Sequence, residues 1–166
     1  MSENTAHHHD DAHTAALLSG RQPALTGCPW HDVNEMLQSA GLRPTRQRMA
    51  LGWLLFGKGA RHLTAEMLYE EATLAKVPVS LATVYNTLNQ FTESGLLRRI
   101  AADGIKSFFD TDTSVHPHFY LEGEDVLVDV TDGLTFTRIP EALPGHEIAR
   151  LDVVVHLRRK RDANPA

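Results

Sequence analysis

One stretch, residues 79–95 (VSLATVYNTLNQFTESG), constrains the fold more than any other part of the chain. Pro78 lacks an amide proton and can stand just before a helix, and Ser80 can cap the amides of the first turn. Apolar side chains then recur at helical spacing, and Gly95 suits the left-handed position that follows many helices. The stretch therefore predicts an amphipathic helix with one buried face.

The opposite face of this helix carries short, uncharged or amide side chains instead of the usual Glu and Lys. Thr83, Asn86 and Gln90 lie there, with Tyr85 at the border. Such side chains suit a surface that meets the hydrogen-bonding edges of bases. An ordinary solvent-facing helix is an equal alternative for this stretch alone, so the neighbouring segments decide.

Those neighbours predict a winged helix-turn-helix. Asp32, Thr45 and Thr64 are candidate N-caps of three preceding helices, the third with Met67, Leu68 and Leu74 on its core side. Two short strands follow at residues 97–101 and 105–109, and the Asp103-Gly104 pair between them is typical of a hairpin turn. In this layout the fourth helix enters the major groove and the hairpin meets the backbone.

Basic side chains fall on the same predicted face. Arg98, Arg99 and Lys106 lie on the wing, and Arg43, Arg46 and Arg48 lie at the start of the second helix, where guanidinium groups can bind phosphates or enter a minor groove. Scattered surface arginines are the alternative for each one alone. The predicted DNA-binding set takes five of these basic residues and four residues from the fourth helix: Arg43, Arg46, Arg48, Ser80, Thr83, Tyr85, Asn86, Arg98 and Lys106.

Charge divides the 166-residue chain into two parts. Residues 31–109 hold nine Lys/Arg against seven Asp/Glu, whereas residues 110–150 hold two against nine, and the whole chain has a net charge of −5. No apolar run approaches the ~18 residues of a membrane span, and no signal-peptide core is visible, so we expect no membrane partner and a cytoplasmic protein. The single cysteine excludes an internal disulfide and a zinc site built from cysteines.

After Asp110 the pattern changes to short strands, expected at residues 118–121, 126–130, 134–139 and 148–157. A module of this size is small for independent stability, so a second copy is expected to cover its apolar face. The predicted fold class is α+β, with an N-terminal winged-helix domain and a C-terminal α/β dimerisation domain. The expected boundaries are a disordered arm (1–27), the DNA-binding domain (28–109), a hinge (110–118), the dimerisation domain (119–161) and a disordered tail (162–166).

Several segments resemble the ferric uptake regulator family: GLRPTRQR (41–48), HLTAEMLYEEA (62–72), VSLATVYNTL (79–88), GLLRRI (95–100), and FDT followed by HPH (109–118). GCPWHDVNEML (27–37) and the run from Arg43 to Gln90 are more similar to its haem-responsive iron response regulator branch. The resemblance implies a dimeric regulator of iron and haem genes that binds A/T-rich palindromic DNA, is active at low iron and is inactivated by haem. A higher oligomer and a haem-delivering protein are further partners that it leaves open.

His116 and His118 are two residues apart on an extended segment, so both side chains can reach one ion. By resemblance, His62, Asp110, His116 and His118 match the family's hinge metal site, and Asp129 replaces a glutamate. An N/O ligand set of this kind suits Zn, Fe(II) or Mn(II). We expect one divalent metal per subunit.

Cys28 is followed by proline, and in a thiolate-ligated haem site such a proline turns the chain away from the porphyrin. In the iron response regulator branch this element is tied to haem sensing, and His116 and His118 are also implicated as haem ligands. We therefore expect haem as an effector at Cys28, His116 and His118. A redox-reactive thiol is the alternative role for Cys28.

Two other functions remain open at this point. The same fold could sense Zn, Mn, Fe or peroxide through the hinge ligands, with Cys28 incidental. A metal-dependent enzyme built on His62, His116 and His118 is a remote third. No catalytic triad, phosphate-binding glycine loop or placed general base is visible, so we predict that the chain is not an enzyme.

Overall fold

The structure is a computed structural model that describes residues 29–132, 134 and 137–160. The described helices are α2 (Pro29–Ser39), α3 (Arg46–Phe56), α4 (Ala65–Leu74) and α5 (Leu81–Glu93). Thr45, Thr64 and Ser80 cap α3, α4 and α5, each accepting a hydrogen bond from the amide three residues later. These three predicted helix starts are confirmed.

Helix α2 differs from the prediction because it begins at Pro29, three residues before the expected cap. A proline fits the first position of a helix, where its missing amide proton costs nothing. Asp32 instead lies in the first turn of α2, where a carboxylate interacts favourably with the helix dipole. In α4 the buried residues are Ala65, Leu68 and Ala72, whereas Met67 and Leu74 are exposed.

The first sheet has three antiparallel strands in the order β1-β3-β2. They are β1 (His62–Leu63), β2 (Arg98–Ala101) and β3 (Ser107–Asp110). β2 and β3 form the predicted wing hairpin. The two-residue β1 was not predicted, because two residues carry no detectable alternation.

The second sheet has the order β5-β4-β6, with β5 antiparallel and β6 parallel to β4. Its strands are β4 (His118–Leu121), β5 (Val126–Asp129) and β6 (Val154–Leu157). None of the described residues between Asp129 and Val154 lies in a helix or strand, so the strand expected at 134–139 is not found there. The C-terminal part described is therefore a β-sheet with long connections.

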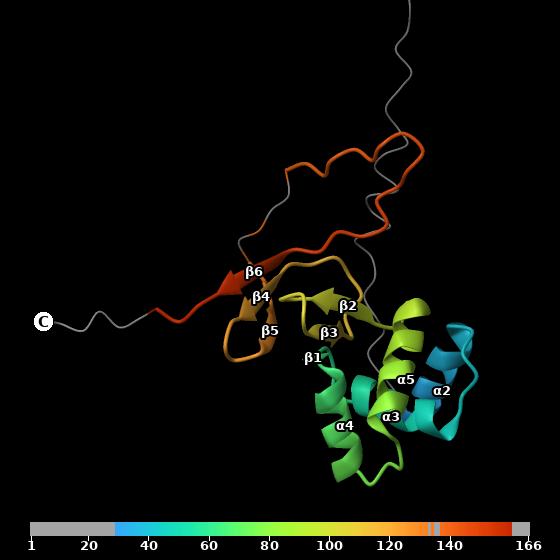
Figure 1. The fold of residues 1–166 in the computed structure, drawn as a ribbon. Coiled ribbons are helices and arrows are strands. Elements are labelled where there is room, and N and C mark those ends of the chain that lie inside the picture. Colours follow the sequence, from blue (N-terminus) through green and yellow to red (C-terminus); the bar gives the residue numbers. More distant parts are fainter. Residues whose placement is uncertain (1–28, 133, 135–136, 161–166) are drawn as a thin grey trace, which may run out of the picture.

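Strand β3 separates two apolar cores, since successive residues of a strand point to opposite sides. Phe109 packs with the helices, whereas Phe108 packs with Ile100, Tyr120 and Leu127 between the two sheets. Figure 1 shows the first sheet lying between the helices and the second sheet. No helix in the described part of the chain is long and apolar enough to cross a bilayer.

Candidate metal centre and nucleic-acid interface

Strand register brings the predicted metal ligands together at one end of the space between the sheets. In the first sheet His62 of β1 pairs with Asp110 of β3, and in the second sheet His118 of β4 pairs with Asp129 of β5. His116 lies in the loop that joins the sheets. Five residues from three stretches of the chain (62, 110–118 and 129) thus offer ligand atoms that all lie within 4.8 Å of one another.

The three imidazoles point their Nε2 atoms at the same two carboxylate oxygens. The distances to Asp110 Oδ2 are 3.4 Å from His62, 3.2 Å from His116 and 3.3 Å from His118. Those to Asp129 Oδ1 are 2.9, 2.9 and 3.5 Å in the same order. Three nitrogens around two shared oxygens make a compact shell with three imidazole and two carboxylate donors.

Hydrogen bonds alone do not satisfy this shell. The Nε2 atom of His62 is buried and has no hydrogen-bond partner of acceptable geometry, although Asp129 Oδ1 is 2.9 Å away. A buried polar atom without a partner is energetically costly. One cation bound in the middle would give all five ligand atoms a partner at once. The residues therefore fit a divalent metal, and the mixed N/O set suits Zn, Fe(II) or Mn(II).

The electrostatics of the cluster favour an ionised carboxylate. Burial of Asp110 opposes its ionisation, but the hydrogen bonds from His116 and His118 and the nearby imidazole of His62 outweigh burial and hold its pKa well below the usual range. The hydrogen bond to Asp110 raises the pKa of His116 to about 9, against the effect of its own burial. A metal ion binding here would replace that proton.

Neighbouring backbone groups orient the ligands. Asp110 Oδ1 accepts a hydrogen bond from the amide of Asp112 at 2.8 Å, which leaves Oδ2 for the imidazoles. The Nδ1 atom of His116 lies 3.1 Å from the carbonyl oxygen of Ser114. Donation from Nδ1 to this carbonyl directs the lone pair of Nε2 into the cluster, as in other metal-binding histidines.

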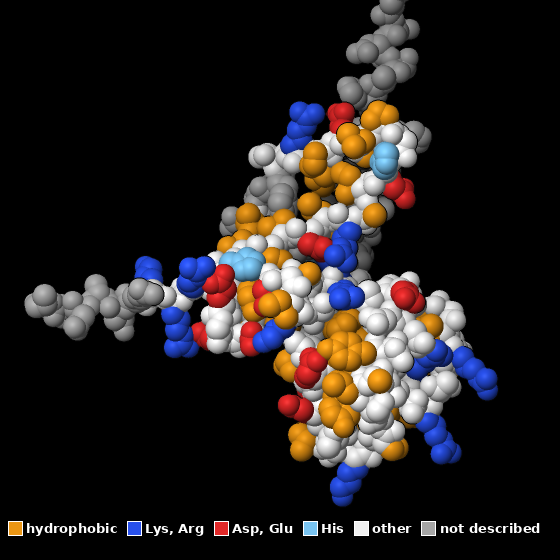
Figure 2. All heavy atoms as spheres, viewed as in Figure 1, with side chains coloured by type: hydrophobic (Ala, Val, Ile, Leu, Met, Phe, Trp, Pro, Cys, Tyr) orange, Lys and Arg blue, Asp and Glu red, His pale blue; other side chains and the backbone are white. Residues whose placement is uncertain are grey.

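The predicted DNA-facing residues of α5 are accessible. Tyr85 and Asn86 are exposed, and the Ser80 hydroxyl caps the helix by accepting from the amide of Thr83 at 3.1 Å. Arg43 and Arg46 are also exposed, and Figure 2 shows Lys and Arg side chains projecting from the helical lobe. Thr83 is partly buried and stays with the cap, since its hydroxyl lies 2.9 Å from that of Ser80.

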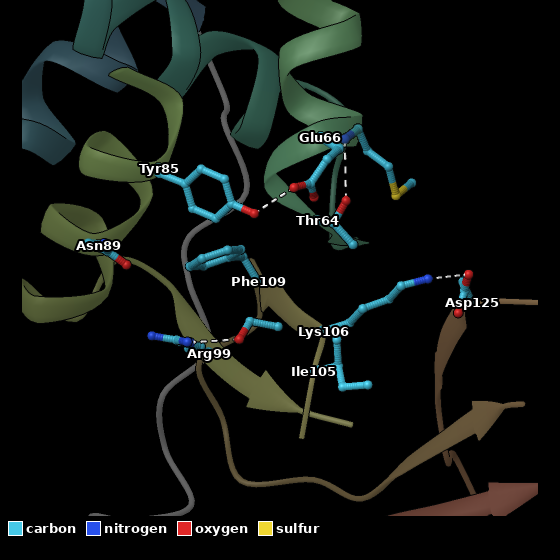
Figure 3. Close-up of a pocket in the computed structure, with 11 residues that line it drawn as sticks. Thr64, Glu66, Tyr85, Asn89, Arg99, Ile105, Lys106, Phe109 and Asp125 are labelled. Carbon is cyan, nitrogen blue, oxygen red and sulfur yellow. Dashed lines mark hydrogen bonds and ion pairs between the residues drawn. The ribbon is translucent and has the colours of Figure 1, made fainter. Parts of the chain in front are cut away.

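A cavity of about 590 Å³ lies between α4, α5 and the wing. Figure 3 shows Tyr85 reaching across it to Glu66, with Arg99 on one side and Lys106 pointing to Asp125. Asn89 and Arg99 line this cavity beside Tyr85 and are further candidates for contacts with DNA. Asn89 lies three residues after Asn86, which is about one helical turn. This spacing on the same face of the helix could have identified Asn89 as a candidate.

The expected DNA contact by Arg98 is wrong. Its side chain is 6 % exposed and points into the protein, where it binds Asp152. Arg99, the next residue on β2, points to the other face and is exposed. Alternation along a strand allows only one of two adjacent arginines to face DNA, and the wing sequence alone does not say which.

Arg48 and Lys106 have partners within the protein. The guanidinium of Arg48 donates to Gln90 Oε1 at 2.9 and 3.1 Å and to the carbonyl of Arg43 at 2.8 Å. It therefore ties the turn before α3 to α5. Lys106 forms an ion pair with Asp125 in the turn between β4 and β5.

The haem prediction depends on a residue that the structure does not describe. Cys28, the arm (1–27) and the tail (162–166) lie outside the described residues. His118 is 1 % exposed and His116 is also partly buried. The enclosed cluster therefore suits an ion better than a porphyrin.

One face of the second sheet is apolar and has no cover in the described part of the chain. The register places Phe119 beside Val128 and Val155, and Leu121 beside Val126 and Leu157, on the face opposite His118 and Tyr120. Val126, Val128 and Leu157 are each about 40 % exposed. This face suits the expected contact with a second copy.

Residues 39–133 match the ferric uptake regulator family. The ferric uptake regulation protein of Pseudomonas aeruginosa is 30% identical over 131 residues, which cover 77% of this chain and 98% of that protein. The protein of the same name from Vibrio cholerae is 36% identical over 85 residues, so the match spans 51% of this chain and only 57% of that relative.

Solved structures agree with these matches. A structure of the ferric uptake regulator from Pseudomonas aeruginosa with manganese aligns with a TM-score of 0.60 and 26% identity, covering 78% of this chain and 98% of that one. The Vibrio cholerae ferric uptake regulator aligns with a TM-score of 0.56 and 25% identity, over 77% and 98% of the two chains. The chain belongs to the ferric uptake regulator family.

Proposed function

We propose that this protein is a dimeric, metal-responsive regulator of transcription whose effector binds at His62, Asp110, His116, His118 and Asp129. The observation that carries the proposal is that these ligands come from two different sheets. His62 and Asp110 belong to the sheet that includes the wing, whereas His118 and Asp129 belong to the second sheet. Binding at the cluster therefore acts on both sheets at once.

The residues of the cluster link metal to DNA in a simple way. A bound divalent cation would supply positive charge that offsets the repulsion between the two carboxylates. Asp110 and His62 would then be held against His118 and Asp129, which fixes the wing relative to the second sheet. Because the coupling is reciprocal, DNA that selects this arrangement also raises the affinity for metal.

The DNA surface in this proposal combines α5, the turn before α3 and the wing. Tyr85 and Asn86 would meet base edges, and Asn can pair bidentately with adenine. Arg43, Arg46 and Arg99 would neutralise phosphates. Two copies joined through the apolar face of the second sheet would read the two halves of an A/T-rich palindrome.

Metal dependence is tested by measuring DNA affinity with and without Mn(II), Zn(II) or Fe(II). We expect the wild-type protein to bind the operator more tightly with metal, and His118→Ala to lose both metal binding and the metal response. His146→Ala is the matched control, because the His146 side chain is exposed and its one hydrogen bond among the described residues is to the carbonyl of Pro144. Operator binding that ignores metal in the wild-type protein would contradict the proposal.

DNA contact is tested by salt titration. Replacing Arg43 or Arg46 by Gln should lower the slope of log affinity against log salt by about 0.9 each, since each removes one phosphate contact. Arg138→Gln is the control, because this exposed arginine lies in the connection between β5 and β6 and pairs with Glu141. A slope unchanged in both arginine variants would remove them from the interface.

We also propose a finer form in which haem is the effector, with Cys28 as a ligand and His116 and His118 as further ligands. The resemblance of residues 27–37 to the haem-responsive branch supports it, whereas the burial of His118 favours the metal-only form. Ferric haem titration of the wild type and Cys28→Ala separates the two. A thiolate-type spectrum lost in Cys28→Ala, with DNA released as haem binds, supports haem sensing; absence of saturable haem binding leaves metal or peroxide as the signal.

A further inference from the structure

We infer that Arg98 is a positioning residue of the metal centre, acting through the loop that carries His116. This inference rests on the proposed metal function and adds a residue that contacts none of the ligand atoms. Its basis is the set of bonds made by a buried guanidinium between three segments of the chain. These segments are β2, the loop between the sheets and the residues leading into β6.

Almost all N–H groups of the Arg98 guanidinium donate hydrogen bonds within the protein. Nη1 donates to the carbonyl oxygen of Ser114 at 2.6 Å, and Nε and Nη2 donate to Asp152 Oδ1 at 3.1 and 2.5 Å. Nη2 also donates to the carbonyl of Leu151. A buried arginine needs partners for its donors, and the planar fork allows these contacts to be made together.

The Ser114 carbonyl is the link to the metal centre. The same oxygen that accepts from Arg98 lies 3.1 Å from Nδ1 of His116, and the hydroxyl of Ser114 lies 3.2 Å from that nitrogen. His116 Nε2 faces Asp110 and Asp129 inside the cluster. Arg98 therefore holds the acceptor that fixes the ring orientation of a ligand, and partners of this kind affect metal affinity strongly.

Register explains why a residue of the wing can do this. Asp110 of β3 pairs with His62 on one side and with Arg98 on the other. Arg98 thus lies on the same face of the first sheet as the two ligands from that sheet. Its length allows the guanidinium to reach the loop at Ser114.

On its other side the Arg98 guanidinium binds the segment that leads into β6. Asp152 and Leu151 directly precede Val153, whose carbonyl accepts from the amide of His118 at 2.9 Å. One side chain therefore connects the wing, the loop with His116 and the segment that supports His118. Loss of this connection should loosen two of the three imidazoles without removing any ligand.

The test uses Co(II) as the probe, with affinity measured by chelator competition and coordination followed by visible absorption. Arg98→Met should weaken Co(II) binding about tenfold and change the absorption spectrum. Arg98→Lys should act in the same direction, because a single ammonium cannot bind Ser114 and Asp152 together, and it serves if Arg98→Met fails to fold. Arg150→Gln is the control, since Arg150 is 51% exposed and binds the other oxygen of Asp152 at 2.5 Å.

A double-mutant cycle separates positioning from general stability. If Arg98 acts mainly through His116, Arg98→Met should weaken Co(II) binding clearly less in a His116→Ala background than in the wild type, because only the effect on His118 is left. An equal effect in both backgrounds, or a lower melting temperature with unchanged Co(II) affinity and spectrum, overturns the inference. Failure of the wild-type protein to bind Co(II) would instead refute the proposed metal function.

Discussion

Among the described residues, seventeen buried side chains form one apolar core around helices α2–α5, whereas five fill the space between the wing and the second sheet. No charged side chain of the four described helices is buried. The smaller core ends at the cluster of three histidines and two aspartates, in which Asp110 is buried, and Arg98 is buried beside this cluster. The two regions therefore depend on different interactions.

This contrast suggests which part of the molecule responds to a signal. Apolar burial in the helical region does not depend on pH or metal, so the shape of the DNA-reading surface should be constant. The region between the sheets depends on charged groups whose balance changes when a proton or a metal binds. The signal should therefore change how the wing sits on the second sheet and leave the helices intact.

The strongest test of this contrast is Phe91→Ala in α5. Phe91 is fully buried and packs against Phe56, with ring centroids 6.1 Å apart. Removing it should cost about 3–5 kcal/mol of unfolding free energy, measured by urea denaturation. Leu74→Ala is the control, because Leu74 is 84% exposed and its loss should change stability by about 0.5 kcal/mol or less.

Metal should stabilise the other region selectively. At a free metal concentration 100 times its Kd, binding adds about 2.7 kcal/mol to the folded state. We expect hydrogen exchange to slow mainly in β4 and β5, and much less in α3 and α5. Equal protection of the helical core would show that the two regions unfold as one unit and would break the comparison.

The stability of the metal-free protein should also depend on pH. The pKa of His116 is about 9 in the folded state against a usual 6.5, so its proton stabilises the fold fully below pH 6.5. This contribution is lost as pH rises through 9, and the unfolding free energy should fall over that window. Asp110 stays ionised throughout and adds no slope. His116→Gln should flatten the profile, and a wild-type profile that is already flat would contradict the assignment.

The sequence predicted the helices well and the faces of the wing poorly. Capping residues such as Thr45, Thr64 and Ser80 act within four residues, so local patterns reveal them. Which of Arg98 and Arg99 points outward depends on how β2 pairs with β3. Met67 and Leu74 have the spacing of core residues, yet α4 buries its Ala65, Leu68 and Ala72 side instead.

The metal ligands were predicted through family resemblance, and their meeting point depends on long-range pairing. The His116-His118 spacing is local, but His62 reaches the site only because the two-residue β1 pairs with β3. No periodicity can reveal so short a strand. The contacts of Arg98 with residues 114 and 152 are more distant still, and only the folded structure brings them together.

The finest test of the comparison concerns the contact between the wing tip and the second sheet. Lys106 is held in an ion pair by Asp125, which also accepts from the Tyr120 hydroxyl at 3.1 Å. Asp125 has a φ of 53°, a conformation that Asn also tolerates, so Asp125→Asn should keep the turn. It removes the charge that holds Lys106 and leaves the lysine free for phosphate.

We therefore expect Asp125→Asn to make the salt dependence of operator binding steeper by about 0.9 in slope, the contribution of one added phosphate contact. Glu124→Gln removes the same charge from the same turn, but Glu124 pairs with Arg159, away from the wing. If both variants steepen the slope equally, net charge is the cause and the wing tip is not restrained. If only Asp125→Asn does so, the second sheet limits what the wing can contact, and the division between a constant helical region and an adjustable wing extends to the DNA surface itself.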